Sequence, residues 1–105
     1  MRYTATTYNI CRLPLSERRL EAQATYDASS PLEAAAKLAE NYPKTLLGFF
    51  AGTPEDIARD FDIIYEGPDG VASHMDGDIL LLVFPEGASE KKLLKEVAAW
   101  EAGVS

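Results

Sequence analysis

The sequence predicts an α+β fold, a two-layer sandwich with a mostly antiparallel sheet of about four to six strands. Two longer helices are expected on one face of that sheet, together with one short helix. Three observations support this class: residues 20–28 alternate apolar and polar side chains, residues 32–42 follow helical spacing, and residues 79–84 form an unbroken apolar run. The expected strands are mostly neighbours along the chain, which favours antiparallel pairing. With 105 residues and no linker-like tract, we expect a single domain over residues 1–105.

The first part of the chain is expected to form two strands and a helix. Residues 1–10 are rich in threonine and tyrosine, a composition typical of strands. In residues 20–28 every second side chain is apolar, as in a strand with one buried face. Ser30 and Glu33, with a proline between them, form a capping box. They predict the start of a helix that cannot continue through Pro43.

The rest of the chain is expected to form a meander of strands and a terminal helix. Residues 45–51 are a short apolar run between a proline and a glycine, and we expect a buried strand there. Thr53, followed by proline, repeats the helix-start signal and predicts a short helix. Asp76-Gly77 is a strong hairpin signal, and Ser89 can cap the last helix. The other strands are expected at residues 62–66, 71–75 and 78–84, the last one central in the sheet.

Negative charge is concentrated in residues 53–78. The formal net charge of the whole chain is −7, and this quarter of the chain carries an imbalance of the same size. Arg59 is its one basic residue. We call its eight acidic residues the acidic belt: Glu55, Asp56, Asp60, Asp62, Glu66, Asp69, Asp76 and Asp78.

The acidic belt has three interpretations: a solvated face with ordinary turn aspartates, an oxygen-ligand site for a hard cation, or a surface for a basic partner. The spacing of the acids does not match the calcium-loop pattern, so no metal is expected. Clustered carboxylates can imitate a phosphate backbone, and we therefore expect a basic, nucleic-acid-binding protein or complex as the partner. The same negative charge argues against direct nucleic-acid binding by this face. The residues that would hold a cation are Glu66, Asp69, Asp76 and Asp78.

Three arginines lie close together in a loop expected between the first two strands. It contains Arg12, Arg18 and Arg19. Arginines in such a loop usually keep a protein soluble, and a secondary binding role is the alternative.

Catalytic signals are weak. His74 is the only histidine, and it is either a hydrogen-bonded surface residue or a general base beside Asp76. A nucleophile pair of Cys11 and His74 would lack a marked orienting group. Ser89 begins an S-x-x-K match that reads more simply as a helix cap. No catalytic residue or cofactor is therefore expected, and the enzyme alternative is a pocket near His74, Tyr65 and Asp76.

The setting expected from the sequence is cytoplasmic. Cys11 is the single cysteine, which excludes an intrachain disulfide, and no signal peptide is evident. The longest apolar run is too short to span a bilayer, so no membrane partner is expected.

The strand-to-helix joint, Ala-Thr-Tyr-Asp-Ala at residues 24–28 and Ser-Pro-Leu-Glu-Ala-Ala-Ala at residues 30–36, resembles small inhibitors carried by phages and mobile elements, such as anti-CRISPR proteins. The resemblance is one of architecture and charge. It implies a block on the nucleic-acid groove of a nuclease or effector complex, with carboxylates in place of phosphates. A homodimer joined through an open sheet edge, with the basic loop of one chain on the acidic belt of another, is a further alternative.

Overall fold

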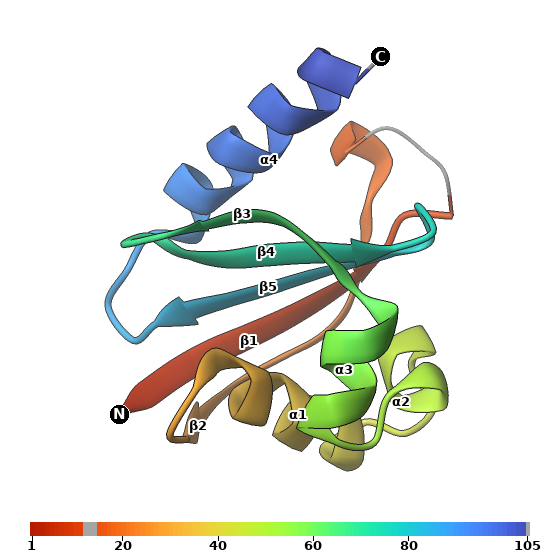
Figure 1. The fold of residues 1–105 in the computed structure, drawn as a ribbon, viewed down its shortest axis with the longest axis vertical. Coiled ribbons are helices and arrows are strands. Elements are labelled where there is room, and N and C mark those ends of the chain that lie inside the picture. Colours follow the sequence, from red (N-terminus) through yellow and green to blue (C-terminus); the bar gives the residue numbers. More distant parts are fainter. Residues whose placement is uncertain (12–14, 105) are drawn as a thin grey trace.

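The computed structural model describes residues 1–11 and 15–104 and shows a five-stranded antiparallel sheet with helices on both faces (Figure 1). This confirms the α+β class and the number of strands. The strand order is β2-β1-β5-β4-β3. The strands are β1 (Arg2–Asn9), β2 (Arg19–Asp27), β3 (Asp62–Gly67), β4 (Gly70–Met75) and β5 (Ile79–Pro85). The helices are α1 (Pro31–Asn41), α2 (Leu46–Phe50), α3 (Pro54–Asp60) and α4 (Glu90–Val104), and a 3-10 turn, η1, spans Leu15–Glu17.

The strand β5 is the centre of the sheet, as its apolar run predicts. It pairs with β1 on one side and β4 on the other, and its apolar side chains are buried. Asp76 and Gly77 in the turn before it have φ values of 49° and 75°. Positive φ at both central residues is the condition for the type I′ turn that suits a hairpin. The Asp78 amide closes this turn by donating to the Met75 carbonyl at 2.9 Å.

The predicted helix starts are confirmed, although the Glu33 carboxylate accepts from the Ser29 hydroxyl and not, as in a standard capping box, from the Ser30 amide. The Glu33 amide donates to the Ser30 hydroxyl at 3.2 Å at the start of α1. At the start of α3, the Asp56 amide donates to the Thr53 hydroxyl at 3.1 Å, and the Asp56 carboxylate accepts from the Gly52 amide at 3.3 Å. These reciprocal bonds satisfy amides that have no partner within the helix.

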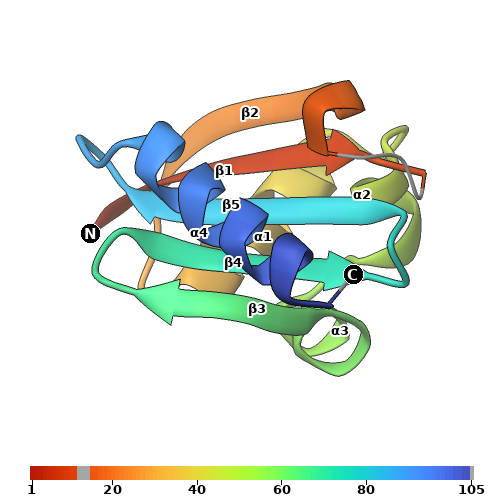
Figure 2. The same cartoon turned by 90° about the horizontal axis from the view of Figure 1, so that it is seen from above.

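The expectation that the two longer helices share one face of the sheet is wrong. The helix α1 packs on β1, β2 and β5 and contacts α2 and α3, whereas α4 packs on β3, β4 and β5. Figure 2 shows α4 crossing the face opposite α1. The sheet is therefore the middle one of three layers, not half of a two-layer sandwich.

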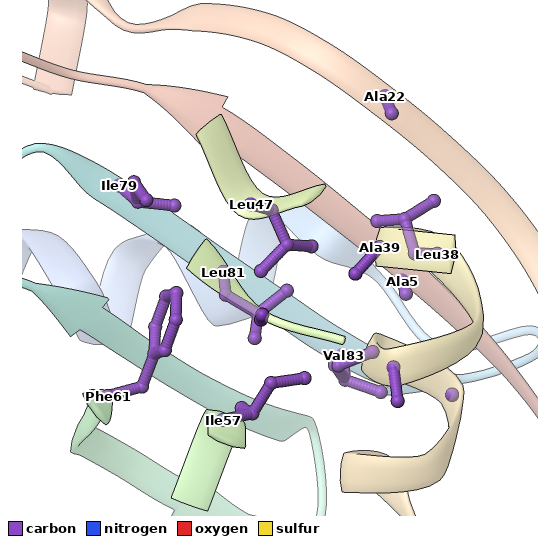
Figure 3. Packing of buried hydrophobic residues seen from close by; sticks show 14 of the residues in the cluster. Ala5, Ala22, Leu38, Ala39, Leu47, Ile57, Phe61, Ile79, Leu81 and Val83 are labelled. Atoms are coloured by element: carbon purple, nitrogen blue, oxygen red, sulfur yellow. The ribbon is translucent and has the colours of Figure 1, made fainter. Parts of the chain in front are cut away.

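The reason lies in the side chains of β5, which are apolar on both faces. Ile79, Leu81 and Val83 belong to the core on the α1 side, where Ile57 and Phe61 of the α3 region also point inward (Figure 3). A strand with apolar side chains on both faces must be covered on both, and here α1 covers one face and α4 covers the other. The core on the α4 side includes Leu80, Leu82, Phe84, Leu93 and Val97.

The expected buried strand at residues 45–51 is also wrong, because this segment forms the short helix α2. The Thr45 hydroxyl accepts from the Gly48 amide at 3.1 Å and caps the helix. A side chain at Gly48 would collide with the backbone of Tyr42 and Pro43. Within α2 only the Leu47 side chain is buried, Ala51 is buried just after it, and Phe49 is 77% exposed. A capped helical turn with few buried side chains therefore forms here instead of a buried strand.

Candidate functional site

The acidic belt lies on α3, on the edge strand β3 and in the turns at both ends of β4 (Figure 2). None of its eight side chains is buried. Glu66 and Asp69 lie near the β3–β4 turn, whereas Asp76 and Asp78 lie at the opposite end of β4. The structure therefore brings the belt together as a band rather than as one compact cluster.

Part of the belt serves the local fold. The Arg59 guanidinium contacts the carboxylates of Asp56 and Asp60, each at 3.0 Å. The pKa of Asp56 is held below its usual value, mainly by the Thr53 hydroxyl and then by the Gly52 amide, with a smaller contribution from Arg59. The pKa of Asp60 is lowered first by its hydrogen bond with Arg59. These two carboxylates are engaged within α3.

The turn aspartates also have structural roles. Asp76 occupies the first positive-φ position of the β4–β5 turn, where aspartate is well tolerated. The Asp78 carbonyl accepts from the amides of Ile10 and Cys11 at 2.9 and 3.3 Å, which ties the end of β1 to this turn.

The other half of the belt has no such local partner. Within residues 1–11 and 15–104, no side-chain hydrogen bond or ion pair involves these carboxylates. Glu55, Asp62 and Glu66 are exposed, and Asp69 is half-buried. We call these four the free acids: Glu55, Asp62, Glu66 and Asp69.

An apolar pocket of about 260 Å³ opens beside the free acids. It lies between the start of α1, the helix α3 and the strands β3 and β4, on the α1 side of the sheet. Glu66 is the only charged residue in its lining. Two apolar lining residues remain well exposed, Ile63 at 59% and Leu32 at 39%. The lining consists of Ser30, Pro31, Leu32, Ile57, Ala58, Phe61, Ile63, Glu66, Val71 and Ser73.

Sequence reasoning missed this pocket. Its lining comes from four elements separated along the chain, and no local spacing joins them. One available signal was Ile63-Ile64 within β3, two adjacent isoleucines on an acidic strand. A bulge between Ile63 and Tyr65 shifts the register there, and Ile63 and Glu66 both line the pocket.

The histidine lies on the other face of the sheet. The His74 ring is 5.1 Å from the Trp100 ring of α4, centroid to centroid, and is half-buried there. Its neighbour Ser73 lines the pocket on the α1 side. The apolar pocket beside Glu66 therefore does not include His74, Tyr65 or Asp76. The pKa of Tyr65 is raised, first by burial and then by Glu96 and Asp69.

The structure does not bring together the residues of two other candidate sites, the Cys11–His74 pair and a metal site. Cys11 is exposed and hydrogen-bonds to Asn9, and the described residues show no contact between it and His74. Among all the residues that the structure describes, no group of three or more histidine, cysteine, aspartate or glutamate side chains could hold a metal ion.

The basic loop is only partly described. Arg12 lies outside the described residues. Arg18 lies over the ring of Tyr8, 5.1 Å from its centroid, and Arg19 begins β2 with an exposed side chain. The Tyr8 hydroxyl donates to Glu90 of α4 at 2.8 Å, and the pKa of Tyr8 is raised first by burial and then by this bond. Arg18 therefore belongs to the contacts that fix the start of α4.

Over the described ranges, no helix is long and apolar enough to cross a membrane. No protein-family model matches the chain, and no curated protein or solved structure shows significant similarity to it.

Proposed function

We propose that this protein is a small cytoplasmic interaction module that docks its acidic belt on a basic partner. The observation that carries the proposal is the set of free acids, which lie on α3, on the edge strand β3 and in the turn after it and form no ion pair with the residues that the structure describes. Carboxylates that form no bond within the protein remain available to Lys and Arg side chains of another protein. The partner class is a nucleic-acid-binding protein or complex, such as a nuclease, whose groove already attracts phosphate charges.

In this proposal the protein acts as an inhibitor or regulator by nucleic-acid mimicry. The resemblance to phage and mobile-element inhibitors of the anti-CRISPR type is consistent with this role. Self-association through the β3 edge is disfavoured, because Asp62 and Glu66 of two copies would face one another and each chain carries a formal net charge of −7.

The test compares two variants of equal charge. The first, Glu55→Gln with Asp62→Asn and Glu66→Gln, neutralises three free acids. The matched control neutralises three carboxylates elsewhere, and these also lack bonds to the described residues. The control residues are Glu17, Glu40 and Glu101.

Each protein is immobilised and exposed to nuclease-treated host-cell extract at low and high salt. Wild type and control should retain a basic protein at low salt and release it at high salt or on addition of double-stranded DNA. The free-acid variant should retain at least roughly tenfold less, because three charge pairs are lost. Equal retention by the two triple variants would overturn the proposal, since net charge alone would then explain capture.

A further inference from the structure

The apolar pocket lies beside two of the free acids, Glu66 of β3 and Glu55 of α3. Ile57 and Phe61 line it as buried residues, whereas Leu32 and Ile63 contribute exposed apolar surface. Ser73 is a buried polar residue in the lining. Exposed apolar surface around a pocket is a common feature of binding sites.

The size of the pocket indicates what it accommodates. Its volume is about 260 Å³. Sites for drug-sized ligands usually exceed about 300 Å³, and a cavity of about 150 Å³ accommodates benzene. One large apolar side chain from another protein therefore suits this pocket better than a whole cofactor or metabolite.

The acidic residues around the pocket favour a bound side chain that has basic residues next to it. Glu66 lines the pocket, and Glu55 lies one helical turn before Ala58. Asp62 lies opposite His74, on the other face of β3, and extends the negative charge around the edge of the sheet. No lysine or arginine is in the lining. The nearest cation along α3, Arg59, is engaged by Asp56 and Asp60. An apolar side chain flanked by acids would be repelled here, and so would a second copy of this acidic chain.

We infer that the pocket between α1, α3 and β3 is an anchor site for one large apolar side chain of a basic protein segment. Lysines or arginines beside the anchor meet Glu55 and Glu66, and Asp62 adds to the negative potential from the edge of the sheet. This inference rests on the proposed function, since it specifies how the basic partner is held. The charges steer the partner and the buried anchor gives the contact specificity.

The test uses two synthetic peptides, a lysine-rich peptide with one central leucine and the same peptide with serine in its place. Ala58→Trp fills the pocket from α3 while leaving every acid in place. Ala98→Trp, on the exposed side of α4, is the matched control. Ile63→Ser is a second pocket variant, which removes exposed apolar surface and adds no bulk. Circular dichroism checks that each variant is folded.

Binding is measured by fluorescence anisotropy at low salt. Wild type and Ala98→Trp should bind the leucine peptide about tenfold more tightly than the serine peptide. Ala58→Trp and Ile63→Ser should reduce or abolish that preference and leave serine-peptide binding unchanged. The Glu55→Gln, Asp62→Asn, Glu66→Gln variant should bind both peptides more weakly and keep the preference for leucine.

The outcomes separate the two proposals. Equal binding of the two peptides by wild type, with weaker binding of both by the free-acid variant, would overturn the anchor site and leave acidic docking intact. A leucine preference that Ala58→Trp and Ala98→Trp reduce alike would also overturn the anchor site. Undiminished binding by the free-acid variant, or no binding of either peptide to wild type, would overturn both proposals.

Discussion

The two outer strands of the sheet both carry carboxylates, but only those of β2 are tied into the fold. On β2, Glu21 accepts a hydrogen bond from the Leu46 amide at 3.1 Å, and Asp27 lies 3.4 Å from the N-terminal ammonium. On β3, Asp62 and Glu66 make no such contact with the described residues. A carboxylate at a sheet edge can thus hold a neighbouring helix in place or remain available to another molecule.

The β3 edge also carries features that discourage pairing with other strands. Its acids and its bulge are both devices that protect an exposed edge from aggregation. Protection of the edge and recognition of a basic partner use the same charges, so stability and binding must be measured separately.

Loss of the core that supports both edges should have the largest effect. Leu81 of β5 is 2% exposed and packs on the α1 side of the sheet. Leu81→Ala should lower the free energy of unfolding by about 2–5 kcal/mol, because transfer energy is lost and a cavity remains. Leu20→Ala on β2, where the leucine is 58% exposed, should change it by no more than about 0.5 kcal/mol. Urea denaturation measures both, and similar losses would contradict the placement of the core.

Removal of one acid from each edge should reveal the contrast directly. Glu21→Ala leaves the Leu46 amide at the start of α2 without its acceptor and should cost about 1 kcal/mol. Glu66→Ala removes a side chain with no described partner and should change stability by no more than about 0.5 kcal/mol. The two substitutions are matched, because each puts alanine for glutamate on an edge strand. Equal losses in urea denaturation would mean that Glu66 also serves the fold.

Much of the fold is readable from local sequence. The capping pairs at Ser30 and Thr53, the Asp76-Gly77 turn and the apolar run of β5 each correspond to a feature of the structure. These signals succeed because each depends on residues within a few positions of one another. The unbroken apolar run of β5 even implies covers on both faces.

The failures depend on three-dimensional geometry that residue patterns do not specify. Nothing local shows whether a given apolar helix covers the near or the far face, so the separation of α1 and α4 was not predicted. The run at residues 45–51 is ambiguous between strand and helix until Gly48 meets the backbone of Tyr42. The acidic belt was predicted as a set, but the division within it depends on Arg59 and on geometry at α3.

Asp56 marks the boundary between structural and free acids within the belt, and its titration should show the smallest effect. Its pKa lies below the usual value for aspartate because the Thr53 hydroxyl, the Gly52 amide and Arg59 favour the charged form. A carboxyl with a lowered folded-state pKa adds stability above its unfolded pKa. That contribution is lost as the pH falls below about 4 and through the folded-state value.

Carbon-detected NMR titration of the Asp56 carboxyl should therefore give a value below that of an unfolded peptide. Thr53→Val should raise the pKa toward its usual value by more than Arg59→Gln, because the hydroxyl is the larger cause and the guanidinium a smaller one. Thr53→Ser retains a hydroxyl and should leave the pKa close to that of wild type. A larger shift from Arg59→Gln than from Thr53→Val would instead make Asp56 a partner of Arg59 first and a helix cap second. In that case a basic partner could compete for Asp56, and the structural part of the belt would be reduced to Asp60, Asp76 and Asp78.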